Sequence, residues 1–328
     1  LAGSSIFHAG SCVVDMNQTL QAPGLKPYGL IYDLVRNYQV PVYWSINPDK
    51  VKDGTDFTVN SKAYKGGPFI IPAEYVTIAQ PAITLWRSKG AVIDCNLPEF
   101  TAPIYDYITS FPNSVLDTQN GSIAATAFYT PAEIPTTAYK IGGPADLVDC
   151  DDVYIMPHAD PHLWDVTTKA IFSNFINKGG ALYAACHAVS SLESPLYGNW
   201  PFLSSTGLID WNNHDDASGL VPYPYEADSA NDPIMQYIGH VEGALDDGSE
   251  QIYLPVLNGS WRPTTTVAVW DPNQADVVAG RSPGKAALVA YGRAYGDPAQ
   301  GLILSQASHT FQNETVAENN AAARTIGN

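Results

Sequence analysis

The chain has 328 residues, of which 45% are hydrophobic and only 15% are charged, so it can bury a substantial core. Its net charge of −17 opposes the approach of phosphate backbones, and we expect no nucleic-acid partner. The apolar runs are strand-sized and broken by Pro, Gly or Asp, which predicts no membrane span. The low charge density and the richness in Tyr, Asn and Pro favour an extracellular or cell-surface protein. The opening Leu1-Ala2-Gly3-Ser4-Ser5 is typical of a mature terminus from which a signal peptide has already been removed.

The first part of the chain predicts a strand, helix, strand unit over residues 11–16, 28–38 and 40–46. In a single sheet such a unit makes the two strands parallel. Residues 53–67 alternate in polarity and turn at Asn60-Ser61, which predicts a hairpin.

The pattern then continues through a strand at 69–72, a helix at 73–89 and a strand at 91–95. Residues 104–108 favour a helix, and residues 122–129 favour a strand. We expect the whole chain, residues 1–328, to form one α/β domain.

The second half repeats this order with a strand at 153–157, a helix at 163–177, Gly179-Gly180 and a strand at 182–186. The stretch between Pro195 and Gly248 is rich in Pro, Gly, Asn and Asp, which predicts a lid or an interaction surface. Further β elements are expected at 252–257, 266–270, 286–291 and 302–305, and a helix is expected from about residue 316.

Cys186 stands where the strand predicted for 182–186 runs into a helix. A nucleophile at such a turn projects from the sheet, and the small residues Ala184 and Ala188 leave room for the sharp bend. The first amides of the helix also favour a thiolate over a thiol. The alternative is a buried core cysteine with no chemical role.

Three stretches resemble the class I glutamine amidotransferase-like superfamily, in particular its DJ-1/PfpI and ThuA-like branches. Ala184-Ala185-Cys186-His187-Ala188 is similar to the cysteine turn of that superfamily, and Gly179-Gly180 is similarly placed before it. Gly301-Leu302-Ile303-Leu304-Ser305, which leads to Ser308-His309, resembles the strand that delivers the histidine. The resemblance implies a flavodoxin-like three-layer sandwich with a mostly parallel sheet and a loop-rich, β-decorated C-terminal half.

The same resemblance implies that Cys186 is a nucleophile for amide or peptide hydrolysis, with His187 or His309 as its base. The backbone amide of His187 would form one side of an oxyanion hole. The superfamily's His-x-Glu pattern is absent, because Phe311 stands two residues after His309, and Glu314 is the next carboxylate. Asp160 is the first candidate for the acid that orients the base, since it lies in the loop Pro157-His158-Ala159-Asp160 at the end of a strand.

That loop also suggests a divalent-metal site. His158, Asp160 and His162 offer three ligands within five residues, and Cys186 or His214 is a candidate for a fourth. The alternative is that Asp160 caps a helix beginning at Pro161. The residues predict no other cofactor.

The four cysteines leave the disulfide pattern open. If Cys186 is free, one bridge can form among Cys12, Cys95 and Cys150. Two functions therefore remain: a cysteine-dependent hydrolase, or a non-catalytic surface or filament subunit. In the second, the loops between Pro195 and Gly248 would contact other copies of the chain or a cell-surface partner.

Overall fold

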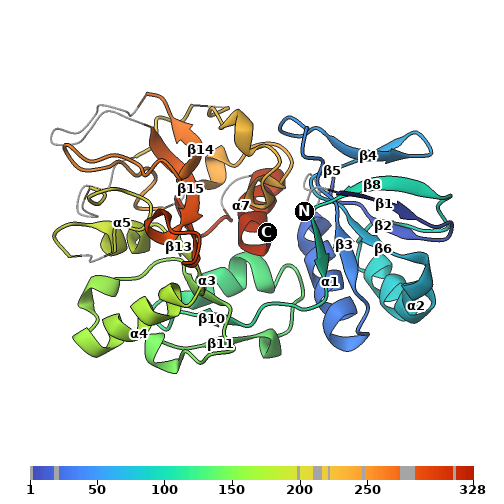
Figure 1. The fold of residues 1–328 in the computed structure, drawn as a ribbon, viewed down its shortest axis with the longest axis horizontal. Helices are drawn as coiled ribbons and strands as arrows, with labels where there is room; N and C mark the ends of the chain where they lie inside the picture. Colours follow the sequence, from blue (N-terminus) through green and yellow to red (C-terminus); the bar gives the residue numbers. More distant parts are fainter. Residues whose placement is uncertain are drawn as a thin grey trace.

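The computed structural model describes residues 3–17, 22–197, 200–209, 216–220, 222–245, 248–273, 285–312 and 315–328. The described chain is a mixed α/β structure in which two larger sheets lie side by side, and the helix α7 (Val316–Gly327) lies between them (Figure 1). One continuous hydrophobic cluster includes residues from both halves. The prediction of one domain over residues 1–328 stays a prediction.

The first larger sheet is built from the N-terminal third of the chain. Its strands, in spatial order, are β7 (Ile93–Asp94), β2 (Cys12–Val14), β6 (Phe69–Ile71), β3 (Val42–Trp44) and β9 (Asp106–Ile108). Two two-stranded ribbons accompany it, β1 (Gly3–Phe7) with β8 (Phe100–Ile104) and β4 (Thr55–Val59) with β5 (Lys62–Lys65). The helices α1 (Lys26–Asn37) and α2 (Ala73–Ser88) pack against each other, and Trp86 Nε1 of α2 donates to Asp33 of α1 at 2.9 Å.

β2 and β3 run parallel to each other in one sheet, as predicted for residues 11–16 and 40–46, but they are not neighbours, and every neighbouring pair in this sheet is antiparallel. β6 lies between β2 and β3 and is antiparallel to both. The reason is the excursion over residues 53–67, which turns the chain back before β6 is made. That excursion is the predicted hairpin, and Asn60 and Ser61 both have positive φ, 49° and 64°, as a tight two-residue turn requires.

The second sheet holds the strand before Cys186. Its strands, in spatial order, are β11 (Tyr139–Ile141), β10 (Ser114–Leu116), β12 (Val153–Met156), β13 (Ala181–Ala185), β16 (Leu302–Gln306), β15 (Ala286–Arg293) and β14 (Thr266–Asp271). The first five strands are parallel, and β15 is antiparallel to both of its neighbours, β16 and β14, which confirms an α/β protein with a largely parallel sheet.

The helices of this half are α3 (Gly121–Ala124), the π-helical segment η2 (Ala125–Tyr129), α4 (Val166–Asn177), α5 (His187–Glu193), α6 (Glu242–Leu245) and α7. Short 3-10 turns occur at η1 (Ala22–Leu25), η3 (Thr136–Ala138), η4 (Pro144–Asp146), η5 (Pro161–Leu163), η7 (Ala227–Ser229), η8 (Pro233–Met235) and η9 (Ala294–Gly296). The strand predicted for 122–129 is therefore helical, since its alanines favour a helix. The helix predicted for 104–108 is extended, in β8 and β9. Residues 252–257 form only isolated bridges. None of the helices in the described ranges has the length and apolarity needed to cross a bilayer.

A close backbone approach sets β13 beside β16. A Cβ added to Gly301 would lie 1.9 Å from the carbonyl oxygen of Gly180, so only glycine lets the start of β16 reach the start of β13. Gly179 has a φ of +97°, which lets the chain turn from α4 into β13. Gly179-Gly180 and Gly301 thus fix the register of the two strands that lead to Cys186 and His309.

α7 joins the two sheets through a fully buried arginine. Arg324 donates to the carbonyl oxygens of Met16 and Gly66, both at 2.8 Å, and to Tyr28 Oη at 3.1 Å. On the other side, Gln306 Nε2 of β16 donates to the carbonyl oxygen of Ala322 at 3.2 Å. The end of β16 is therefore tied, through α7, to the N-terminal third of the chain.

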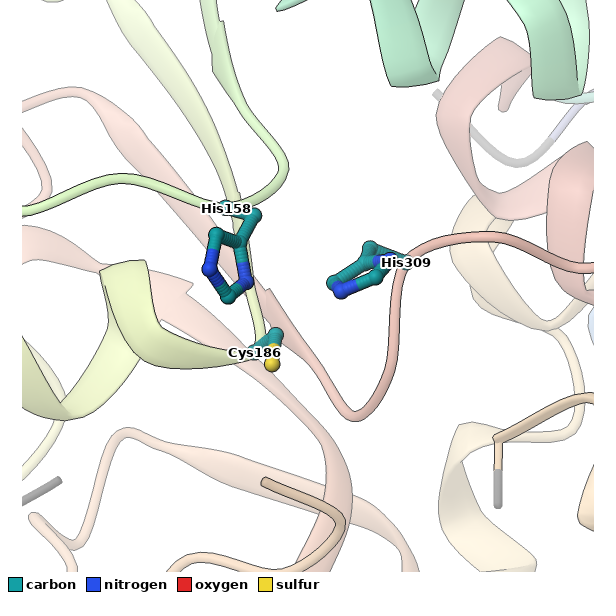
Figure 2. A group of neighbouring side chains, drawn as sticks. All are labelled: His158, Cys186 and His309. Atoms are coloured by element: carbon teal, nitrogen blue, oxygen red, sulfur yellow. The ribbon is translucent and has the colours of Figure 1, made fainter. Parts of the chain in front are cut away.

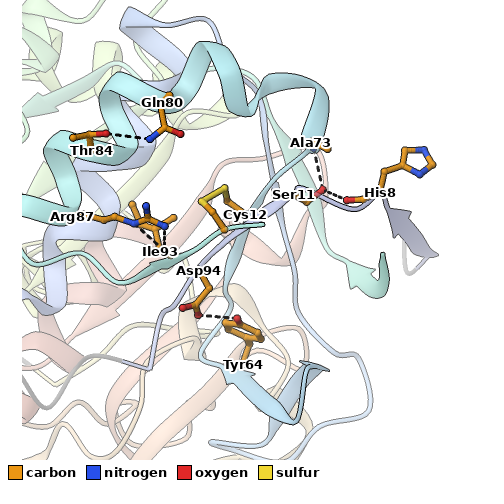
Figure 3. The surroundings of a disulfide bond; sticks show 11 residues. His8, Ser11, Cys12, Tyr64, Ala73, Gln80, Thr84, Arg87, Ile93 and Asp94 are labelled. Carbon is orange, nitrogen blue, oxygen red and sulfur yellow. Dashed lines mark hydrogen bonds between the residues drawn. A yellow bond between two sulfur atoms is a disulfide. The ribbon is translucent and has the colours of Figure 1, made fainter. Parts of the chain in front are cut away.

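The open question of disulfide pairing is answered by a bond between Cys12 and Cys95, with Cys150 and Cys186 free (Figure 3). The bond joins β2 to the residue after β7. Beside it, Arg87 of α2 donates from Nε to the carbonyl oxygen of Ile93 at 3.0 Å. The disulfide therefore holds the edge strand β7, which is only two residues long, against β2.

A buried carboxylate anchors the segment that follows α5. Glu193 is 3% exposed and accepts hydrogen bonds from the backbone amides of Leu203 and Ser204, at 2.8 and 3.0 Å, and from the Ser204 hydroxyl. Burial raises the pKa of Glu193 to about 7 from its ordinary 4.5. The start of the stretch between Pro195 and Gly248 is thus attached to the core.

Glu193 makes stability depend on pH. Below pH 4.5 the carboxyl is protonated in both the folded and the unfolded chain; between 4.5 and about 7 only the folded chain keeps the proton. The free energy of unfolding should therefore fall by about 3 kcal/mol across this range. Urea unfolding at pH 4.5 and pH 8 measures this loss, and Glu193→Gln should show a correspondingly shallower dependence. Equal pH dependence in the two proteins would contradict the assignment.

Candidate active site

Three neighbouring parallel strands bring a thiol and two imidazoles to one edge of the large sheet. His158 follows β12, Cys186 follows β13, and His309 follows β16. Parallel strands end at a common edge, where α/β proteins place functional groups. The sulfur of Cys186 and one ring nitrogen from each histidine lie within 4.8 Å of one another. Figure 2 shows the two rings flanking the side chain of Cys186 from different strands.

The predicted strand-to-helix turn is present at Cys186. Its φ of 50° and ψ of −131° lie outside the regions that L-residues ordinarily occupy. Hydrogen bonds hold this conformation: the Cys186 amide donates to the carbonyl oxygen of Gln306 at 3.2 Å, and Tyr253 Oη lies 3.3 Å from the Cys186 carbonyl oxygen. Strain of this kind, maintained by the surrounding structure, is typical of functional sites.

The Cys186 thiol is fully buried, and its sulfur lies 3.4 Å from Ser249 Oγ. Burial raises the pKa of the thiol, and the nearby charge of Glu250 adds to this; hydrogen bonds from Ser249 and from the backbone of Glu250 and His187 act in the opposite direction. The first amide of the helix, that of His187, thus favours the thiolate as expected, but burial outweighs it and leaves the pKa of the thiol raised.

The histidines contact one another around the sulfur. The ring centroids of His158 and His309 are 4.9 Å apart, with the planes at 87°. His309 Nδ1 lies 2.8 Å from Thr310 Oγ1, and this contact orients the ring. Asn120 Nδ2 donates to the carbonyl oxygen of His158 at 2.6 Å and so holds the loop that carries it.

His187, the second predicted base, is placed differently from His309. Its ring lies against His158, with centroids 4.5 Å apart, and its Nε2 is 3.3 Å from Ser249 Oγ. Since that hydroxyl is itself 3.4 Å from the sulfur, His187 connects to Cys186 through Ser249. Its backbone amide hydrogen-bonds to the Cys186 side chain, on the side where the predicted oxyanion hole would form.

Asp160 faces away from this cluster. Its carboxylate lies 3.9 Å from His162 Nδ1, and its amide donates to Gln119 Oε1 at 2.8 Å. The role of Asp160 in orienting the base stays a prediction. The His309 ring is in contact with Thr310. Asp160 precedes the 3-10 turn η5, but its side chain makes no capping bond. The alternative prediction, that Asp160 caps the helix beginning at Pro161, is therefore wrong. Asp165 caps the helix, by accepting from the Thr168 amide at 2.7 Å.

The metal set His158, Asp160 and His162 does not come together. On the turn η5, His162 points to Ser191, with Nδ1 2.7 Å from its Oγ, so its ring diverges from His158. Among the described residues, the group found able to hold a metal ion is His158, Cys186 and His309. His214 and Glu314 lie outside the described residues.

Two residues next to the sulfur were not predicted from the sequence. Ser249 contacts both Cys186 and His187, and Glu250 is 4% exposed, with its carboxylate accepting from Ser190 Oγ at 2.7 Å. The Glu250 carbonyl oxygen also accepts from the amide of Ser308, next to His309, at 3.2 Å. Both residues come from a long irregular segment, which carries no periodic signal for its place in the fold.

The chain was compared with protein-family models, with curated proteins and with solved structures. None of the three comparisons found a match. The function therefore has to be inferred from the residues and geometry of the site.

Proposed function

We propose that this chain is a cysteine-dependent hydrolase that cleaves a carbon–nitrogen bond of an amide or peptide, with Cys186 as the nucleophile. The observation that carries the proposal is the backbone of Cys186, held at positive φ where β13 meets α5 with two imidazoles beside the sulfur. A cysteine that merely fills a core needs neither the unusual backbone nor the imidazoles. The resemblance to the amidotransferase-like superfamily points in the same direction.

The chemistry divides among the residues as follows. His309 takes the proton from the Cys186 thiol as the sulfur attacks the carbonyl carbon, and a C–S bond forms. The carbonyl oxygen gains negative charge, which the His187 amide stabilises. The C–N bond then breaks, and the amine leaves with the proton from His309. Water, deprotonated by the same imidazole, hydrolyses the thioester and restores the thiol.

We place this activity outside the cell or at its surface. Disulfides persist in oxidising compartments, and the Cys12–Cys95 bond supports this location together with the acidic, weakly charged composition. No nucleic acid is part of the proposal.

The two free cysteines allow the proposal to be tested within one molecule. Cys150 is exposed and serves as the internal control, while Cys186 is buried. In protein freed of metal with EDTA, iodoacetamide at neutral pH should alkylate Cys186 at least as fast as Cys150, because the effect of a nearby base on Cys186 outweighs its poor access to the reagent. Mass spectrometry of peptides sampled over time gives both rates. Alkylation of Cys150 alone in the folded protein, with Cys186 reacting only after unfolding, would refute the nucleophile.

The alternative proposal, a non-catalytic surface or filament subunit, rests on apolar side chains exposed in the stretch between Pro195 and Gly248. Leu196 is 72% exposed and Tyr225 is 40% exposed. Sedimentation of the purified chain tests it. Assembly that is lost in Leu196→Glu would support a contact role, and a monomer at every concentration would exclude self-association through these loops.

The sequence also suggested a divalent metal. In the part of the chain that the structure describes, the group of side chains able to hold one is His158, Cys186 and His309, which the proposed reaction already uses. A metal there would compete with the nucleophile.

A further inference from the structure

We propose that Zn²⁺ binds to His158, Cys186 and His309 and holds the nucleophile inactive until the metal is removed. The proposal concerns the regulation of the same site and, for its inhibitory part, rests on the proposed hydrolase function. Its basis is the meeting of three ligand atoms from three different loops within 4.8 Å of one another.

The ligand atoms lie close enough for a tetrahedral centre to form after a small adjustment. Zn–N bonds of about 2.0–2.1 Å and a Zn–S bond of about 2.3 Å place ligand atoms about 3.4–3.6 Å apart. The separations of up to 4.8 Å therefore need to close by roughly 1 Å, which rotation of two half-buried imidazoles about their side-chain bonds can supply. Figure 2 shows His158 and His309 on separate loops near the side chain of Cys186.

The donor set selects the kind of metal. One thiolate and two imidazoles suit Zn²⁺, whereas Ca²⁺ and Mg²⁺ prefer several oxygen ligands. Three protein ligands leave one coordination position for water or an exchangeable ligand. The net charge of −17 also raises the concentration of cations near the protein.

Binding removes the nucleophile by ordinary acid–base and coordination chemistry. The Cys186 S–H bond breaks, its proton passes to solvent, and the sulfur lone pair forms the bond to zinc. Each imidazole gives a lone pair from one ring nitrogen, and zinc releases its bound waters until one coordination position remains outside the three protein ligands. No electron is transferred. The sulfur and the base His309 are then both occupied by the metal, so neither can take part in attack on a carbonyl.

Zinc protection of Cys186 tests the inhibitory part. Protein freed of metal with EDTA and then desalted is treated with iodoacetamide at increasing ZnCl₂. We expect alkylation of Cys186 to slow at least tenfold and to saturate at one zinc per chain. Alkylation of the exposed Cys150 should change little at that stoichiometry, and MgCl₂ should protect neither cysteine.

Cobalt tests the ligand set without relying on reactivity. In the Cys150→Ser background, Cys186 is the one remaining free cysteine, so absorption from a sulfur–cobalt bond reports Co²⁺ at this site. We expect Cys186→Ala to abolish this band, and His158→Ala or His309→Ala to weaken Co²⁺ binding at least tenfold. His162→Gln is the matched control, since His162 contacts Ser191, and it should bind Co²⁺ as the parent does.

The outcomes separate the two proposals. A reactive Cys186 that neither Zn²⁺ protects nor Co²⁺ ligates would overturn the metal site and leave the hydrolase standing. A cobalt–sulfur band in a protein whose Cys186 is inert without metal would refute the nucleophile and, with it, the inhibitory part. A band unaffected by His158→Ala and His309→Ala but lost in His162→Gln would overturn the ligand set.

Discussion

Replacement of His309 by alanine should slow the alkylation of Cys186 about 10²-fold or more, the usual effect of losing a general base. The reason is that burial keeps Cys186 as a thiol, so its reaction requires a base at the moment of attack. The second-order rate constant with iodoacetamide at neutral pH, followed by mass spectrometry, measures the effect. His309 contacts Thr310 and His158.

Three comparisons make this result specific. The rate at Cys150 should stay the same in every variant, because that residue is exposed and is not a member of the group formed by His158, Cys186 and His309. His162→Gln should react as the parent does. His158→Ala should slow Cys186 less than His309→Ala, since the proposal gives the proton transfer to His309. A parental rate in His309→Ala together with a large loss in His158→Ala would instead assign the base to His158.

Loss of the Cys12–Cys95 disulfide should lower the free energy of unfolding by about 4 kcal/mol. The two cysteines are 83 residues apart, and opening a loop of this size adds conformational entropy to the unfolded chain. The double variant Cys12→Ala/Cys95→Ala, compared with the parent by urea unfolding, measures this difference. We choose alanine rather than a polar replacement because position 12 is fully buried.

Cys150→Ala is the control for the disulfide, because Cys150 is exposed and unpaired, and it should alter stability by no more than about 0.5 kcal/mol. Dithiothreitol should lower the free energy of unfolding of the parent by as much as the double substitution does. It should not change the stability of the double variant. A double variant as stable as the parent would show that the N-terminal sheet does not depend on this bond.

The sequence was sufficient where one local pattern sets the structure. The hairpin at Asn60-Ser61 and the turn at Cys186 are of this kind, since turn residues and small neighbours act over a few positions. The approach of His309 to Cys186 was also predictable in principle. Both residues follow strands of one parallel sheet, and the carboxyl ends of such strands share an edge.

What could not be predicted depends on contacts between distant segments. The position of β6 between β2 and β3 follows from the path of the chain after the hairpin, which no periodicity reports. The raised pKa of Cys186 comes first from burial and then from the charge of Glu250, which lies more than sixty positions further along the chain.

The metal ligands show the same limit. Spacing suggested His158 with Asp160 and His162 because the three are close in sequence. The fold instead joins His158 to residues 28 and 151 positions further along, because β12, β13 and β16 are neighbours. Short spacing failed here because the turn η5 points consecutive side chains in different directions.

The position of β16 in the large sheet bears on when the site comes into being during synthesis. β16 lies between β13 and β15, although both precede it in the chain, and α7 follows it to pack on Gln306 and to reach Met16 through Arg324. A nascent chain on the ribosome therefore carries Cys186 for more than a hundred residues before His309 is made. On the proposed function, a partly translated chain would therefore hold the nucleophile without its base, and its activity would begin only when synthesis is almost complete.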